Sequence, residues 1–190
     1  NPADIRAVQL KMDLSGSRFD LETTQGTIAI KTPLMGKHNV YNILAAAGIC
    51  LKEGFSLTEI QKGVARLSGV PGRLERIDQG QPFSIFVDYA HTEDALQNVL
   101  TSIREVKPSR ILVLFGCGGD RDKTKRPKMA SVVERYADVA IVTNDNPRTE
   151  DPLAIVADIK RGFQKNNYEV ILDREQAIRK ILTSAKAGDC

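Results

Sequence analysis

The amino-acid sequence predicts an α/β fold whose larger part is a mostly parallel, doubly wound sheet. In residues 77–190, short apolar runs of strand length alternate with segments whose apolar residues recur at helical spacing. Strands and helices that alternate in this way form parallel sheets with right-handed crossovers. Residues 1–76 differ, because two alternating strands come there before any helix. The change of pattern predicts a domain boundary near residue 77.

The first part begins with a β-rich segment. Residues 18–22 and 27–31 alternate in polarity, and the polar residues between them are typical of a hairpin loop. A helix is expected over residues 39–53. Its buried face is expected to contain the residues at helical spacing, Ile43, Ala46, Ala47, Cys50 and Leu51. Ser56 and Glu59 have the spacing of a capping box, which predicts that a second helix begins there.

The second part alternates strands and helices throughout. Strands are expected at residues 83–87, 110–115, 138–143 and 168–172. Helices are expected at residues 93–106, 127–136, 152–164 and 174–186. Open sheets of this kind bind their ligands beyond the carboxyl ends of the strands, so the residues that follow each strand are the candidates for a site.

Composition excludes several classes of function. A net charge of +3 and the absence of Trp argue against a nucleic-acid-binding protein. No apolar run reaches the length of a membrane span, and no signal peptide is visible, so we expect no membrane insertion. The three cysteines lack metal-ligand spacing, which favours a reducing compartment and a cytoplasmic protein without a metal of its own. Because no Met begins the chain, we interpret it as a piece of a longer protein.

Asp145-Asn146-Pro147-Arg148, which follows the strand expected at 138–143, is the most informative motif. The planar guanidinium of Arg148 is suited to a carboxylate, and Asp145 could hold an ammonium group. Together they suit a zwitterionic amino acid. The alternative is a strand-to-helix turn without a ligand, because Asp, Asn and Pro are common in turns.

Two other strand ends carry polar residues. Asp88, after the first strand of the second part, could accept hydrogen bonds from a ribose, and His91 could contact a nucleotide or be a surface turn residue. Glycines 116, 118 and 119 would let backbone amides approach an anion, and Arg121 adds positive charge. Because Arg121 replaces the third Gly of G-x-G-x-x-G, an NAD-binding domain is disfavoured. The P-loop pattern G-x-x-x-x-G-K-[ST] is absent from the sequence.

The first part and the linker also offer nucleotide contacts. Asn39 and Asn42 share one side of the expected helix, where their amides could bind an adenine edge. Asn39 could instead be a simple N-cap. Arg73, in the expected linker, could reach a nucleotide phosphate or ribose, or be a plain linker residue.

Taken in order, these motifs resemble the Mur ligase family, the ATP-dependent amide-bond ligases of peptidoglycan precursor synthesis. The resemblance covers nearly all of the chain, and motifs 116–123 and 145–148 are most similar to the member that adds meso-diaminopimelate. It implies a Rossmann-like C-terminal domain over residues 77–190, truncated at its end. Residues 1–76 would be the last part of the central α/β ATP-binding domain.

The resemblance also implies a reaction and residue roles. ATP would phosphorylate the D-glutamate carboxylate of UDP-N-acetylmuramoyl-L-alanyl-D-glutamate, and the diaminopimelate amine would attack the acyl phosphate. The implied ATP-binding residues are His38, Asn39, Asn42, Arg73, Asp88 and His91. The implied diaminopimelate-binding residues are Arg121, Asp145, Asn146, Pro147 and Arg148. No side chain of the chain would be a nucleophile, and the Mg²⁺ ligands are expected upstream, so the fragment alone should be inactive.

Alternatives to this interpretation remain. A sister ligase that adds lysine or glutamate is possible on the same scaffold, but lysine lacks the second carboxylate that Arg148 would bind. A non-catalytic module that binds an amino acid or a nucleotide is a second alternative, favoured by the missing P-loop. The sequence also departs from the family pattern at Glu93, where the family usually has Pro, and it lacks a C-terminal Gly-Lys-Gly-His-Glu segment.

Overall fold

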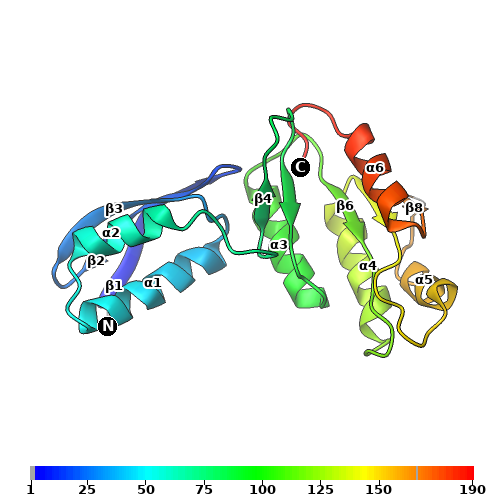
Figure 1. Ribbon diagram of the computed structural model, residues 1–190, viewed down its shortest axis with the longest axis horizontal. Coiled ribbons are helices and arrows are strands. Elements are labelled where there is room, and N and C mark those ends of the chain that lie inside the picture. The colour runs from blue at the N-terminus through cyan, green and yellow to red at the C-terminus, as the bar shows by residue number, and fades with distance from the viewer. Residues whose placement is uncertain (1–2, 166) are drawn as a thin grey trace. The chain divides into compact units, whose positions relative to one another are not determined.

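The computed structural model describes residues 3–165 and 167–190. The chain divides into two compact units, residues 1–76 and residues 77–190 (Figure 1). The division falls inside the short strand β4 (Glu75–Ile77), which pairs with β5 (Ile85–Val87).

The N-terminal unit is an antiparallel sheet with two helices. Its strands follow in sequence order, β1 (Ile5–Asp13), β2 (Gly16–Thr23) and β3 (Gly26–Thr32). The predicted hairpin is confirmed, because β2 pairs with β3 in register from Ser17–Thr32 to Thr23–Gly26. The sequence did not predict β1, whose alternation is interrupted by an irregularity between Val8 and Lys11, where Gln9 has a φ of 52°.

Helices α1 (Lys37–Lys52) and α2 (Leu57–Arg66) pack against this sheet. The capping box is confirmed, because the Ser56 and Glu59 side chains each accept a hydrogen bond from the other residue's backbone amide. The buried face of α1 is narrower than predicted: Ile43 and Ala47 are buried, but Ala46 is exposed. The N-terminal core consists of Phe19, Leu21, Ile30, Leu34, Val40, Ile43, Ala47 and Ile60.

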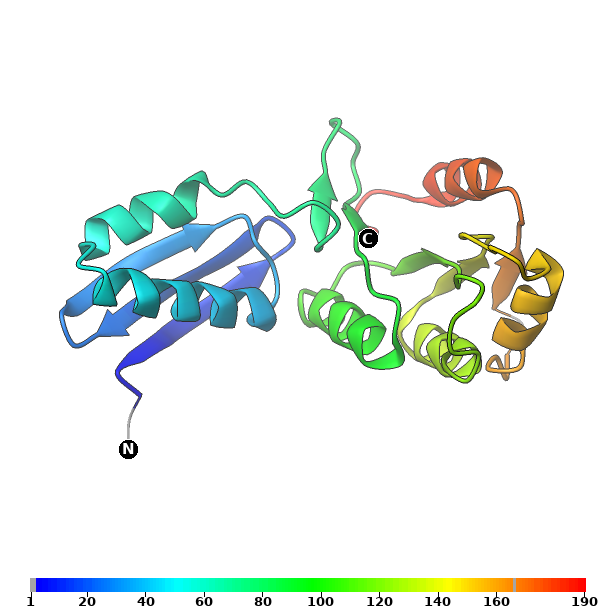
Figure 2. The same cartoon turned by 60° about the horizontal axis from the view of Figure 1, so that its bottom comes forward.

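The C-terminal unit is a parallel sheet with helices on both faces. Its strands lie in the order β6 (Leu112–Phe115), β7 (Val139–Val142) and β8 (Tyr168–Val170). The helices are α3 (Glu93–Glu105), α4 (Lys125–Tyr136), α5 (Pro152–Lys160) and α6 (Arg174–Ser184). Helix α4 packs against α3 and α5, whereas α6 contacts β6 from the opposite face (Figure 2). The predicted mixed α/β fold with a parallel sheet is therefore confirmed.

One strand of the predicted sheet lies elsewhere. The strand expected at 83–87 is β5, and it pairs with β4 rather than with β6. Residues 188–190 lie beside β6 instead: Ser109 N donates to Gly188 O at 2.9 Å, Cys190 N to Arg110 O at 2.9 Å, and Leu112 N to Cys190 O at 2.7 Å. These bonds alternate between the two segments as in a parallel ladder. On their other side, Ser84 N donates to Asp189 O at 2.9 Å. The C-terminal residues thus separate the segment before β5 from β6.

Helix boundaries agree closely with the predictions. The ends of α1, α3, α4 and α6 lie within two residues of the predicted ones. Helix α5 is the exception, because it ends at Lys160 instead of residue 164. The chain there passes so close to α4 that a Cβ at Gly162 would lie 1.9 Å from Pro127 O. This close approach requires glycine just after the helix.

Candidate functional site

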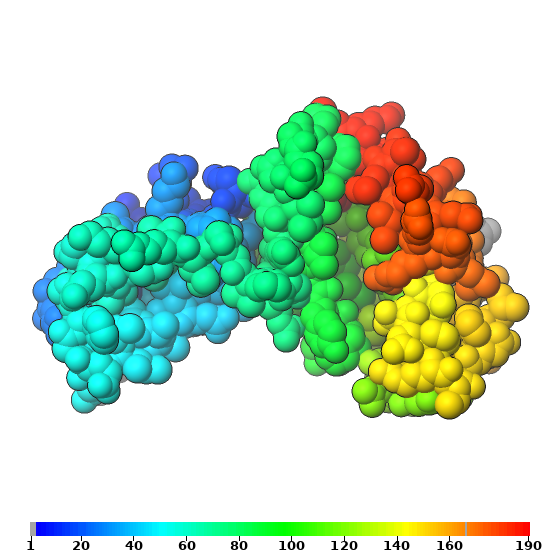
Figure 3. Space-filling model, viewed as in Figure 1, coloured from blue at the N-terminus to red at the C-terminus, as the bar shows by residue number. Residues whose placement is uncertain are grey.

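The loops that follow β6 and β7 form the candidate site of the C-terminal unit. We call residues 116–121 the glycine loop and residues 143–150 the arginine loop. Because β6 and β7 are parallel neighbours, their carboxyl ends lie at one edge of the sheet. The segment that contains the arginine loop, yellow in Figure 3, is exposed at the surface of this unit.

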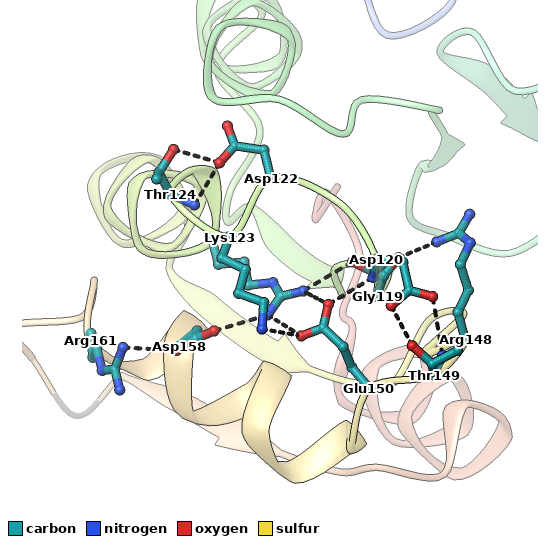
Figure 4. Close-up of polar contacts among 12 residues, drawn as sticks. Gly119, Asp120, Asp122, Lys123, Thr124, Arg148, Thr149, Glu150, Asp158 and Arg161 are labelled. Atoms are coloured by element: carbon teal, nitrogen blue, oxygen red, sulfur yellow. Dashed lines mark hydrogen bonds and ion pairs between the residues drawn. The ribbon is translucent and has the colours of Figure 1, made fainter.

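Hydrogen bonds join the two loops at several points (Figure 4). Gly119 N donates to Asn146 O at 2.8 Å. Thr149 donates to the Asp120 carboxylate twice, from Oγ1 at 2.6 Å and from its backbone N at 3.3 Å. Arg148 Nη1 donates to Gly119 O at 2.6 Å. The loops therefore form one hydrogen-bonded layer beyond the sheet.

The glycines make this close contact possible. A Cβ at Gly116 would lie 2.4 Å from Thr143 O, and one at Gly119 would lie 1.9 Å from Pro147 O. A Cβ at Gly118 would lie 2.9 Å from Arg148 Nη1. The interpretation that these glycines free amides for an anion is wrong for Gly119, whose amide is already bonded to Asn146 O. The glycines instead allow the loops to touch.

Arg148 is held in an unusual conformation. Its φ of 50° is left-handed, and its backbone N donates to Asn146 Oδ1 at 3.3 Å. Its side chain is anchored through Nη1 to Gly119 O. The Nε and Nη2 atoms have no hydrogen-bond partner in residues 3–165 and 167–190, so part of the guanidinium fork is available to a ligand.

Arg121 and Asp145 are exposed, and neither side chain forms a hydrogen bond or an ion pair with the part of the chain that the structure describes. Arg121 lies in the glycine loop and Asp145 in the arginine loop. Asp145 also contacts the glycine loop, since its Cβ lies 3.2 Å from where a Cβ of Gly116 would be. The site thus offers a cation and an anion that the fold does not use. Such a pair of charges suits a zwitterion.

A buried ion cluster beneath the loops was not predicted. Arg126 of α4 is fully buried, and it binds Glu150 with two hydrogen bonds of 2.8 and 3.0 Å and Asp158 with one of 2.9 Å. Hydrogen bonding by Arg126 is the main reason that the pKa of Glu150 is lowered to about 2. A signal was present, because Arg126 has helical spacing to the apolar residues Met129, Ala130 and Val133 and so faces the core.

The residues proposed to bind ATP divide between the units. His38, Asn39, Asn42 and Arg73 belong to the N-terminal unit, and Asp88 and His91 to the C-terminal unit.

In the N-terminal unit, the N-cap of α1 is Gly36, so the alternative that Asn39 is an N-cap is wrong. Asn39 is buried and donates to Met35 O at 2.8 Å, while Asn42 Nδ2 donates to Asn39 Oδ1 at 3.4 Å. Both asparagines line an otherwise mostly apolar cavity of about 530 Å³ between α1 and α2. His38 and Arg73 are exposed.

In the C-terminal unit, Asp88 Oδ1 accepts a hydrogen bond from Ala90 N at 2.7 Å. His91 Nδ1 lies 3.0 Å from Tyr89 O, and the two rings make an edge contact with centroids 5.1 Å apart. Local hydrogen bonds therefore shape the turn that follows β5. His91 itself is exposed.

The described residues offer no site for a metal ion, a disulfide or a membrane span. Among residues 3–165 and 167–190, no three His, Cys, Asp or Glu side chains are grouped so that they could hold a metal ion. Cys50, Cys117 and Cys190 are free thiols, and burial raises the pKa of Cys117 to about 11. None of the described helices is both long and apolar enough to span a bilayer.

Comparison with known proteins identifies the family. Residues 72–190 match the Mur ligase glutamate ligase domain, and residues 1–50 match the Mur ligase middle domain. The chain is 49% identical over 189 residues to the UDP-N-acetylmuramoyl-L-alanyl-D-glutamate–2,6-diaminopimelate ligase of Geobacillus thermodenitrificans. That match covers 98% of this chain but only 39% of the relative, so the chain spans about two fifths of that protein's length.

Solved structures agree with the sequence matches. A solved structure of a UDP-N-acetylmuramoyl-L-alanyl-D-glutamate–2,6-diaminopimelate ligase matches with a TM-score of 0.71 and 40% identity, and the match covers 100% of this chain and 39% of the other. A folylpolyglutamate synthase from Mycobacterium tuberculosis has a TM-score of 0.75 but 21% identity over 95% of this chain and 41% of its own, and so supports the fold alone. The chain therefore belongs to the Mur ligase family.

Proposed function

We propose that the chain is part of an ATP-dependent ligase that joins meso-diaminopimelate to UDP-N-acetylmuramoyl-L-alanyl-D-glutamate through an acyl phosphate. The observation that carries this proposal is Arg148, which is anchored to Gly119 O through Nη1 and keeps its other donors free within the described residues, in a pair of joined loops that also carry the exposed Arg121 and Asp145. The 49% identity to the diaminopimelate ligase of Geobacillus thermodenitrificans supports the same choice of amino acid.

The amino-acid end of the proposal rests on charge and geometry. Arg148 and Arg121 would bind the carboxylate of the second amino-acid centre, which lysine lacks. Asp145 would bind an ammonium group, and the Asn146 amide would donate to the same end of the ligand. Pro147 would stabilise the turn, because its ring restricts φ and its carbonyl oxygen accepts a hydrogen bond of 2.9 Å from Glu150 N.

The ATP end of the proposal involves both units. We assign residues 1–76 to the middle domain and residues 77–190 to the glutamate ligase domain. Asn42 would contact adenine, with Asn39 orienting it, because the Asn39 amide is committed to Met35 O. His38, Arg73, Asp88 and His91 would complete the nucleotide contacts.

The chemistry needs positioning more than a reactive side chain. An acyl phosphate is already activated, so the ligase accelerates its reaction by holding the amine near it and by neutralising charge. Mg²⁺ would supply charge neutralisation on ATP, but the described residues contain no cluster of three acidic, His or Cys side chains that would hold it. The three free thiols are consistent with the cytoplasm as its location.

The test is a titration of the ¹⁵N-labelled chain with meso-diaminopimelate and, separately, with L-lysine. We expect diaminopimelate to shift the backbone resonances of the glycine and arginine loops and to bind more tightly than lysine. Arg148→Ala should remove the difference between the two ligands. Arg179→Ala, which changes an exposed arginine of α6, is the matched control and should keep it. Equal affinities of the unmodified chain for both ligands would contradict the proposal, as would no binding of diaminopimelate.

A further inference from the structure

We propose that Glu150 and Arg126 are positioning residues that hold the arginine loop against the glycine loop and so fix the guanidinium of Arg148. This inference rests on the proposed function for its choice of ligand. Neither residue is expected to touch the amino acid: Arg126 is fully buried beneath the loops, and the Glu150 carboxylate is taken up by other partners.

The Glu150 carboxylate is the point where three segments meet. It accepts two hydrogen bonds from Arg126 of α4, which match a bidentate arginine–carboxylate pair. It also accepts a hydrogen bond of 2.7 Å from Asp120 N of the glycine loop and forms an ion pair of 3.1 Å with Lys123 Nζ. Figure 4 shows Glu150 between Lys123 and Asp120, with Arg148 on the other side of Asp120. One carboxylate of the arginine loop therefore fastens that loop to its neighbours.

Arg126 makes a rigid anchor for this carboxylate. Its guanidinium is fully buried and is also held by Asp158 of α5 at 2.9 Å. A buried guanidinium cannot leave its partners without losing most of its compensation for desolvation. Because Asp158 belongs to α5 and has no bond to either loop, the two carboxylates around Arg126 have different tasks. Asp158 holds the anchor, and Glu150 holds the loop.

The position of Arg148 depends on this fastening. Arg148 lies two residues before Glu150, and its Nη1 reaches Gly119 O only while the loops stay in contact. Glu150 binds Asp120 N, the residue directly after Gly119. A loss of the Glu150 bonds would leave the two loops joined only through Asn146, Thr149 and Arg148 itself, so the segment that places the guanidinium would be held less firmly. Misplacing a binding group by about 1 Å is enough to lose most of its contribution.

The experiment compares Glu150→Gln with Asp158→Asn in this chain. Both replace a carboxylate beside Arg126 by an uncharged amide, but only the Glu150 side chain is bonded to the glycine loop. We expect Glu150→Gln to weaken meso-diaminopimelate binding about fivefold, as much as loss of an exposed arginine–carboxylate contact. Asp158→Asn should leave the dissociation constant within about twofold of the unmodified chain, because Asp158 bonds to neither loop and Arg126 keeps its two bonds to Glu150.

A second readout needs no ligand. Hydrogen exchange of the Gly119 amide, which is bonded to Asn146 O, reports contact between the loops. Glu150→Gln should speed its exchange relative to the amide of Ile141 in β7, whereas Asp158→Asn should change the two amides together or not at all. If Glu150→Gln leaves the Gly119 exchange unchanged, the positioning role is overturned. It is also overturned if Asp158→Asn weakens binding as much as Glu150→Gln.

The two proposals can fail separately. If the unmodified chain binds no diaminopimelate, the proposed function fails, and the exchange of the Gly119 amide still decides whether Glu150 holds the loops. If the chain binds diaminopimelate but Glu150→Gln binds it equally well, the function stands and the positioning role is refuted.

Discussion

Substitution of Gly119 by Ala tests how closely the two loops of the site must pack. The new Cβ would lie 1.9 Å from Pro147 O and 2.6 Å from Pro147 C. Both atoms belong to the backbone, so no side-chain rotation relieves the contact. Real Cβ atoms essentially never approach a heavy atom more closely than 3.0 Å, and the loops would therefore have to separate by about 1 Å.

The structure allows the cost to be worked out. Overpacking of this kind costs about 1–3 kcal/mol, and the weakened bonds from Gly119 N to Asn146 O and from Arg148 Nη1 to Gly119 O add about 1 kcal/mol each. Since part of the strain is relieved when the bonds lengthen, we expect Gly119→Ala to lower the free energy of unfolding by about 3 kcal/mol. For a unit of this size the melting temperature should fall by roughly 10 °C.

Gly118→Ala is the matched control. Its Cβ would lie 2.9 Å from Arg148 Nη1, the end of a flexible side chain that can move away. We therefore expect near-normal stability but weaker binding of diaminopimelate, because Arg148 is displaced. Thermal unfolding followed by circular dichroism measures the first effect, and NMR titration the second. The reasoning is refuted if Gly119→Ala melts within about 2 °C of the unmodified chain, or if Gly118→Ala is the less stable variant.

Three further predictions concern the charged groups. The pKa of Glu150 lies at about 2 instead of 4.5. The pairing of Glu150 should therefore stabilise the chain fully above about pH 4.5 and progressively less as the pH falls toward 2. The difference in urea midpoint between the unmodified chain and Glu150→Gln should accordingly shrink between about pH 6 and about pH 3. Arg126→Met removes the buried guanidinium that Glu150 and Asp158 share and should destabilise the chain by about 3 kcal/mol in urea unfolding. Asp189→Asn removes the pairing of a buried carboxylate with Arg110 and should cost about 1–2 kcal/mol, with faster hydrogen exchange at Leu112 N, which is bonded to Cys190 O.

Local signals made the helices predictable. Ser56, Thr92, Asp151 and Asp173 each cap a helix with a side-chain acceptor, and apolar residues at helical spacing follow them. Pairing between distant segments has no such signal. The C-terminal residues 188–190 are too few, and too rich in turn-forming residues, to look like a strand. Their place beside β6 depends on backbone bonds and on the ion pair of the buried Asp189 with the partly exposed Arg110.

The position of the site was more predictable than its construction. Strand length and alternation with helices indicated that β6 and β7 are parallel. Because parallel strands end at the same edge of a sheet, the polar residues that follow them were expected to lie together. The sequence could not predict that Gly119 allows the close contact with Pro147. A glycine is equally suited to an anion-binding site and to a close backbone approach. Arg126 could have been found, since it falls on the apolar side of its own helix.

The exposure of Arg148 limits what this chain can achieve by itself. An arginine–carboxylate pair in water is worth about 0–1 kcal/mol, so diaminopimelate should be preferred over lysine by no more than about fivefold. Strong rejection of lysine requires that the guanidinium be left unpaired away from water, where the loss is several times larger. Arg148 and Arg121 are both exposed in the described structure. The two loops can therefore determine which amino acid is preferred. A large preference for diaminopimelate over lysine would require further residues that cover the bound amino acid, in a ligase as long as the relatives. Measuring the preference in this chain and in such a ligase would separate the two contributions.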